Sequence, residues 1–179
     1  MATDGVKRFQ LYLLDQMRAE REIDRALVTL GATRDEMHAA HRELKALGFG
    51  GAAHPTSLYL DLLGAPREVA PSERDVALLR YRLPLWPELD FTVEQVGGDR
   101  AANWYFRRVS GANVPRALEP WQILQDEVMH RLPPATPGDQ WNHMVDWLIS
   151  LGGGSQLLLC FDFALLQRVE FLDDEPGAK

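Results

Sequence analysis

The sequence predicts an α+β fold in which N-terminal helices precede a small, mainly antiparallel sheet with two further helices packed on it. Three observations support this fold class. Apolar residues recur at helical spacing over residues 6–47. From residue 90 the spacing changes to alternation, and residues 90–96 and 103–110 flank a glycine-containing loop, as in a β-hairpin. Helical and strand-like segments do not alternate along the chain, so the pattern does not require a parallel sheet.

The first helical segment covers residues 6–30. It carries two apolar stripes at helical spacing, and the charged residues over 18–22 predict a break between them. Gly31 follows the second stripe. It predicts the end of a helix, because glycine readily adopts the left-handed conformation found after the last helical turn.

Residues 34–47 carry signals for both ends of a helix. Thr33 and Glu36 predict a capping box, in which each side chain accepts a hydrogen bond from the other residue's backbone amide. Gly48 supplies a left-handed residue after the helix, and Phe49 is placed to fold back on its last turn. The sequence therefore defines this helix at both ends.

The middle of the chain has a weaker pattern. Residues 48–55 predict a glycine-rich loop, whereas residues 57–64 fit either a strand or a helix. Ser72 is a typical N-cap residue, so a helix is expected over residues 73–81.

The C-terminal third predicts two helices followed by two strands. Residues 121–132 and 140–154 have apolar residues at helical spacing. Residues 156–163 are apolar on both faces, as in a central strand, and residues 165–174 return to alternation.

Length and composition fit a soluble globular protein. The chain has 179 residues, of which 46% are hydrophobic and 25% charged, enough to form a sizeable core. We expect one domain over residues 1–179, with a possible helical subdomain over 1–50 and an α+β part over 56–175. The chain begins without the apolar segment of a signal peptide, so a cytoplasmic protein is expected. The single cysteine, Cys160, lies in an apolar run far too short to span a membrane and predicts a buried, unreactive thiol.

The net charge of −7 is unevenly distributed. Residues 1–50 are neutral overall, and the acidic excess lies in residues 51–179, which contain the consecutive Asp173, Asp174 and Glu175. Such a segment attracts basic protein surfaces and repels phosphate-rich partners. Nucleic-acid binding is therefore expected only through residues 20–50, and no membrane binding is expected.

The helix over 34–47 resembles the recognition helix of winged helix-turn-helix domains. That family commonly shows Thr/Ser-Arg, a hydrophobic residue, Arg-Glu-Leu and Leu-Gly-Phe at these positions. The matching residues here are Thr33-Arg34, Met37, Arg42-Glu43-Leu44 and Leu47-Gly48-Phe49. The resemblance implies that Arg34, His38 and Arg42 contact DNA.

The sequence also departs from this family at three places. Asp35 and Glu36 put carboxylates where the family faces DNA phosphates, and His41 stands where the family prefers an apolar residue. The candidate wing, residues 48–57, contains no Lys or Arg for the DNA backbone.

Histidines provide a further alternative. His38 and His41 are spaced to lie on one face of a helix, where their two imidazoles could bind one metal ion, and His54 lies nearby in the sequence. Ala39 and Ala40 separate the first pair, which therefore does not match the zinc-protease pattern HExxH. No catalytic motif is found in the sequence, so we predict no cofactor, no metal and no enzymatic activity.

Tryptophan and arginine favour protein binding, because both are frequent anchors at protein interfaces. Arginine outnumbers lysine by sixteen to three, and Trp86 lies between two prolines where we expect it on the surface. The sequence is therefore interpreted as a small, acidic, non-enzymatic protein-binding module, such as an inhibitor, an immunity or antitoxin-like protein, or an adaptor. Its expected partner-binding residues are Trp86, Asp173, Asp174 and Glu175. A winged helix-turn-helix regulator is the first alternative, and a histidine-dependent metalloenzyme is the second.

Overall fold

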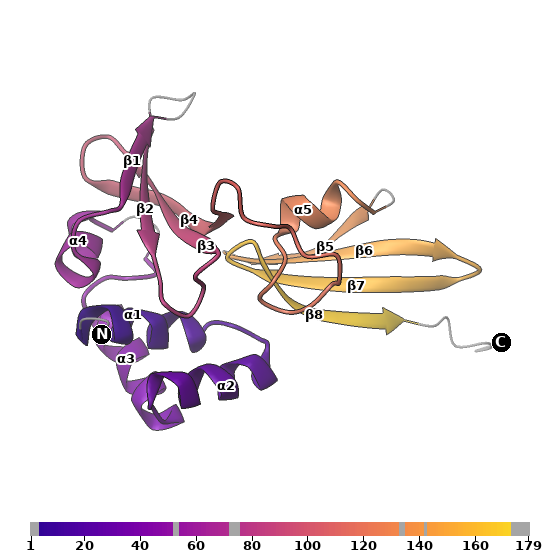
Figure 1. Cartoon of the computed structure of the whole chain (residues 1–179), viewed down its shortest axis with the longest axis horizontal. Helices are drawn as coiled ribbons and strands as arrows, with labels where there is room; N and C mark the ends of the chain where they lie inside the picture. The colour runs from indigo at the N-terminus through magenta and orange to yellow at the C-terminus, as the bar shows by residue number, and fades with distance from the viewer. Residues whose placement is uncertain (1–3, 52–53, 72–75, 133–134, 142, 173–179) are drawn as a thin grey trace. The chain divides into compact units, whose positions relative to one another are not determined.

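The chain forms two compact units, residues 1–110 and 111–179 (Figure 1). The structure is a computed structural model, and it describes residues 4–51, 54–71, 76–132, 135–141 and 143–172. Each unit combines helix with a four-stranded antiparallel sheet, so the predicted α+β class is confirmed. There are two sheets, however, where the sequence suggested one. Residues 4–50, which contain three helices, belong to the first unit.

The described part of the first unit contains four helices: α1 Asp4–Leu14, α2 Glu20–Leu30, α3 Arg34–Ala46 and α4 Ser57–Leu63. The predicted break in the first helical segment is confirmed, since residues 15–19 separate α1 from α2. Gly31 ends α2 in the left-handed conformation, with φ of 56°, also as predicted. The ambiguous segment over 57–64 is a helix.

Both predicted ends of α3 are confirmed. The Glu36 N–H donates to Thr33 Oγ1, and Glu36 Oε2 accepts from the Thr33 N–H, which completes the capping box. At the other end Gly48 has a φ of 105°. The Phe49 N–H donates to the carbonyl of Leu44, and the Phe49 ring is buried.

The first sheet has the order β1-β2-β3-β4, with strands Glu68–Pro71, Ala77–Arg82, Leu89–Val96 and Arg100–Arg108. The predicted hairpin is confirmed as β3 and β4, which are joined by a turn at residues 97–99. The predicted helix over 73–81 is wrong, because β2 occupies residues 77–82 and pairs on both sides. Leu79 and Tyr81 alternate with arginines, and both side chains are buried in the core. This burial, together with backbone pairing to β1 and β3, outweighs the local preference for helix. Ser72 lies outside the described residues.

The core of the first unit is largely aromatic. The Phe9 ring of α1 lies 5.1 Å from that of Phe91 in β3, and Phe91 lies 5.5 Å from Phe106 in β4. Trp86 joins this cluster at 4.8 Å from Phe106 and is 3% exposed. The expectation that Trp86 lies on the surface is therefore wrong. The flanking prolines shape the backbone, but the indole has more apolar area to bury than any other side chain.

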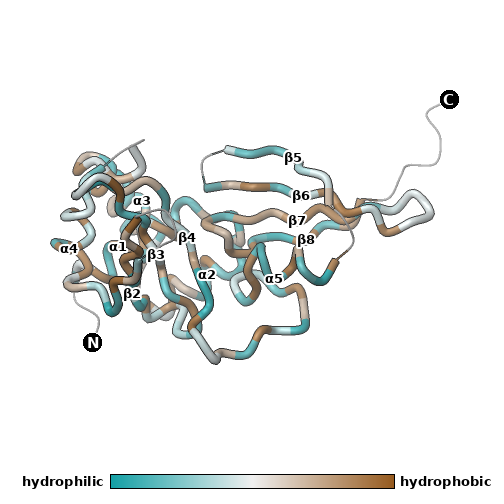
Figure 2. Tube along the Cα trace, turned by 90° about the horizontal axis from the view of Figure 1, so that it is seen from above, coloured by the Kyte–Doolittle hydropathy of each residue, from teal (hydrophilic) through white to brown (hydrophobic). Residues whose placement is uncertain are grey.

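The second unit contains α5 Gln125–Met129 and a sheet of order β5-β6-β7-β8. Its strands are Ala135–Trp141, Met144–Gly152, Ser155–Asp162 and Leu165–Leu172. The last two strands and the burial of Cys160 confirm the sequence predictions. Figure 2 shows β7 as largely hydrophobic and the edge strand β5 as largely hydrophilic.

Of the two helices predicted for this unit, one is wrong and the other is too long. Residues 140–141 of the segment over 140–154 belong to β5, and Met144–Gly152 forms β6, because its apolar residues also alternate and pairing with β5 and β7 buries Ile149. The helix predicted over 121–132 is limited to α5. Trp121 has a φ of 63°, which a helix excludes, and its N–H donates to the carbonyl of Leu166 at 2.8 Å.

Within the part of the chain that the structure describes, no helix has both the length and the apolar character needed to cross a bilayer.

Candidate functional site

The helices α2 and α3 form a helix-turn-helix with a three-residue connection, residues 31–33. Met37, Ala40 and Leu44 of α3 are buried. The opposite side of α3 is exposed and carries Arg34, His38 and Arg42. The structure therefore brings together on one helix face the three residues expected to contact DNA.

Arg34 is already engaged by carboxylates of the preceding helix. Its Nη2 lies 2.6 Å from Asp24 Oδ1 and 2.8 Å from Glu20 Oε2. The hydrogen bond to Asp24, and next that to Glu20, raise the pKa of Arg34 above its already high value. A DNA phosphate would have to replace two acids, so this arginine contributes less to phosphate binding than the sequence suggests.

The described residues after α3 form no hairpin before the next helix. The candidate wing over 48–57 leads instead into α4, and His54 forms a single bridge with Ala101 of β4. A short connection thus joins α2 to α3, and the segment after α3 leads into a helix.

The histidines of α3 share one acid. His38 Nδ1 lies 2.5 Å from Asp15 Oδ1, and His41 Nδ1 lies 2.9 Å from Asp15 Oδ2, although the latter contact lacks hydrogen-bond geometry. Among the described residues, no group of three or more His, Cys, Asp or Glu side chains has an arrangement suited to a metal ion. Asp15 lies 23 residues from His38, and the sequence offered no signal for this contact.

His54 is in a different environment. It is buried in the aromatic core, with Nε2 2.8 Å from the Tyr59 hydroxyl and Nδ1 facing the carbonyl of Gly51. Nδ1 therefore carries the proton and Nε2 accepts from Tyr59. Burial lowers the pKa of His54. This histidine stabilises the core, and its two nitrogens are already used within it.

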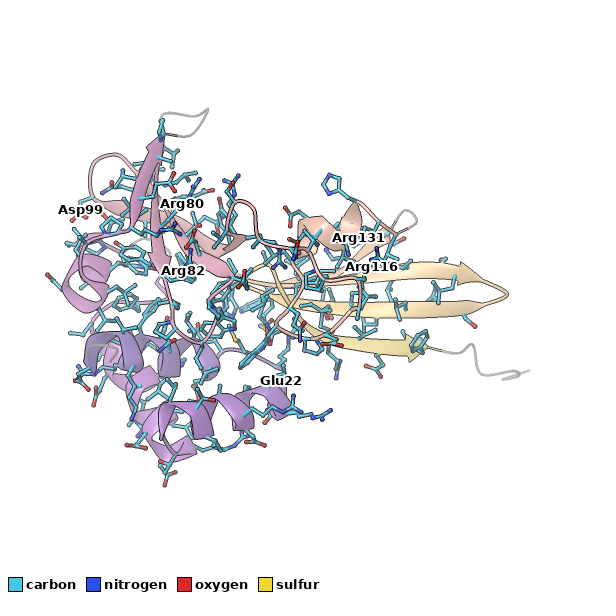
Figure 3. All side chains as sticks on the ribbon, viewed as in Figure 1. Glu22, Arg80, Arg82, Asp99, Arg116 and Arg131 are labelled. Carbon is cyan, nitrogen blue, oxygen red and sulfur yellow. The ribbon has the colours of Figure 1, made fainter. Side chains whose placement is uncertain are left out.

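Asp99 fixes the start of α4 from the β3–β4 turn (Figure 3). Its carboxylate accepts hydrogen bonds from the Thr56 hydroxyl and from the Ser57 N–H, the latter at 2.9 Å. The bond from Thr56 and next that from Ser57 lower the pKa of Asp99. The carboxylate thus links the start of α4 to the sheet.

The first sheet presents a group of arginines on the side opposite its aromatic core. We call this the arginine face, and it consists of Arg67, Arg80, Arg82 and Arg107. Arg80 and Arg82 project from β2 (Figure 3), and Arg107 of β4 is on the same side because both it and Arg82 pair with Asp90. The four arginines share this side with the carboxylates of Glu68, Asp90 and Glu94, so the positive charge of the face is largely compensated.

Carboxylates hold the guanidinium groups of Arg67, Arg80 and Arg82 in place. The buried Asp90 lies 2.9 Å from Arg82 Nε and 3.6 Å from Arg67 Nη1. Glu68 lies 2.8 Å from Arg80 Nη1. A buried carboxylate and fixed cross-strand pairs reduce the freedom of these arginine side chains.

A pocket of about 190 Å³ adjoins the arginine face. Arg67 and Arg82 line it together with the apolar side chains of Val6, Leu63 and Leu83. The pocket can therefore receive an apolar side chain beside two guanidinium groups. The signal for this site in the sequence was the alternation Arg80-Tyr81-Arg82, which is visible only once the segment is recognised as a strand.

Of the four expected partner-binding residues, the structure describes one. Trp86 belongs to the core, and Asp173, Asp174 and Glu175 lie outside the described residues. No family model matches the chain, and no curated protein and no solved structure is significantly similar to it.

Proposed function

We propose that the chain is a non-enzymatic protein-binding module, and that the arginine face with its pocket is the surface that contacts the partner. The observation that carries this proposal is the presence of Arg67 and Arg82, positioned by a buried carboxylate, in the lining of a pocket whose lining also includes apolar side chains. Arginine beside an apolar pocket is the composition of interface hot spots. A rigid sheet supports the site, so little order has to be gained on binding.

Charge affects binding in two ways, during the approach of the partner and at contact with it. The net charge of −7 and the run Asp173-Asp174-Glu175 favour approach of a partner with a basic surface, because long-range attraction depends on total charge. At contact distance the arginine face needs carboxylates or carbonyl oxygens opposite it. The expected partner is therefore a protein that is basic overall and presents an acidic or carbonyl-rich element carrying an apolar side chain.

Affinity capture from the native host tests the proposal when it is combined with charge-reversed variants. The variant Arg67→Glu/Arg107→Glu changes two exposed arginines of the face, and Arg116→Glu is an exposed control in the second unit. Wild type and control should retain one host protein that the double variant loses, and retention should fall as salt is raised. A circular dichroism melt confirms that each variant is folded. Equal retention of that protein by all three would refute the role of the arginine face, and an eluate containing only nucleic acid would refute protein binding.

A DNA-binding regulator is the second candidate, favoured by the helix-turn-helix of α2 and α3. Arg42 is exposed and is the better test than Arg34, whose removal leaves Glu20 and Asp24 without their cation. If this candidate is correct, the wild type shifts a specific DNA in a gel, and Arg42→Ala abolishes the shift without changing the melting temperature.

A further inference from the structure

The outer edge of β8 is paired at its start and open over the rest of its length. The Trp121 N–H donates to the carbonyl of Leu166 at 2.8 Å, and the Leu166 N–H donates to the carbonyl of Ile123 at 3.0 Å. Beyond these bonds, no strand described in the structure pairs with this edge, because β8 is the last strand of its sheet. Residues 168–172 therefore present an open backbone edge.

The register shows which backbone groups point outward. The backbone N–H and C=O of Leu166 point away from β7, because they bond to residues 121 and 123. Gln167 is an extra residue in β8, a bulge between Leu166, which pairs with Phe161, and Arg168, which pairs with Cys160. Alternation in an antiparallel ladder then directs the N–H and C=O of Val169 and Phe171 away from β7. Two residues on this edge can thus form new ladder bonds.

The side chains here do not protect the edge as they do on β5. That strand, at the other edge of the same sheet, contains Pro137 and is largely polar. On β8 the Phe171 ring is 70% exposed, and Val169 packs against the core only in part. Arg168 and Glu170, of opposite charge, flank Val169 and lie 3.3 Å apart on the other side of the sheet. The edge is therefore apolar on one side and self-complementary in charge on the other.

We propose that this edge binds a second copy of the chain, with the two β8 strands antiparallel about a twofold axis at Val169. The N–H and C=O of Val169 then bond to those of Val169 in the second copy. Arg168 of each copy faces Glu170 of the other at a position without ladder bonds, where opposed side chains are closest. Phe171 covers Val169 of the second copy, which accounts for its exposure in the single chain. The proposal concerns the second unit alone and goes beyond the proposed function.

Charge exchange across the twofold axis gives a specific test. Arg168→Glu places two pairs of acids opposite each other in a homodimer, and Glu170→Arg places two pairs of arginines. Each variant alone should be monomeric in sedimentation velocity at concentrations where the wild type dimerises. An equimolar mixture should form a heterodimer, because each of the two facing pairs then joins an acid of one variant to an arginine of the other.

The exchange Arg168→Glu/Glu170→Arg within one chain is the matched control. It reverses both charges while preserving every cross-strand pair, so it should dimerise like the wild type. A wild type that remains monomeric throughout the concentration range overturns the proposal. So does a mixture of the single variants that remains monomeric, or a single variant that dimerises as well as the wild type.

Discussion

Replacing Thr33 with alanine tests how much the capping box contributes to the first unit. The change removes the bond from the Glu36 N–H to Thr33 Oγ1, which spans 3.2 Å. Both residues are exposed, so water replaces the lost hydroxyl, and the buried face of α3 keeps the helix in place. We therefore expect the free energy of unfolding to fall by about 1 kcal/mol, as is usual for an N-cap, and not by the larger cost of an unpaired buried amide.

Thermal unfolding followed by circular dichroism measures this loss. In a unit of this size about 1 kcal/mol corresponds to a decrease in melting temperature of about 4 °C. Thr29→Ala is the matched control, because the Thr29 hydroxyl is exposed and bonds to the carbonyl of Arg25 within α2. Its removal affects no cap, and alanine favours the helix, so the melting temperature should not fall. Equal melting temperatures for Thr33→Ala and the wild type would show that the capping box does not stabilise α3.

Three further predictions concern buried side chains. Trp86→Ala should lower the free energy of unfolding by about 3–5 kcal/mol in denaturant titration, because it leaves a cavity beside Phe106; a surface role would leave stability unchanged. Cys160 is fully buried, so thiol labelling should be slow in the native protein and fast in denaturant, and rapid native labelling would contradict its position in β7. Burial lowers the pKa of His54, so the unfolded chain binds a proton at higher pH than the folded one. Stability should therefore decrease as the pH falls below about 6.5, and His54→Gln should show a smaller decrease in denaturant titrations at pH 7 and pH 5.

The sequence by itself determined the elements whose signals are local. The capping box of Thr33 and Glu36 and the left-handed Gly31 and Gly48 specify helix ends through groups only a few residues apart. The hairpin of β3 and β4 was equally readable, because its strands alternate on either side of a turn. The exposed face of α3 followed from the helix itself, so Arg34, His38 and Arg42 could be grouped in advance.

Only the tertiary structure decided the elements and contacts that depend on distant segments. Residues 77–82 and 144–152 have apolar residues that fit more than one period, and they became strands because neighbours on both sides bond to their backbone. Trp86 became buried because the core had room for the largest apolar side chain. The carboxylates of Asp15 and Asp90 reached their histidines and arginines only through folding. A helix forms its hydrogen bonds between residues four apart, so local sequence is enough to predict it. A strand and a binding face take their partners from distant parts of the chain, so local sequence does not predict them.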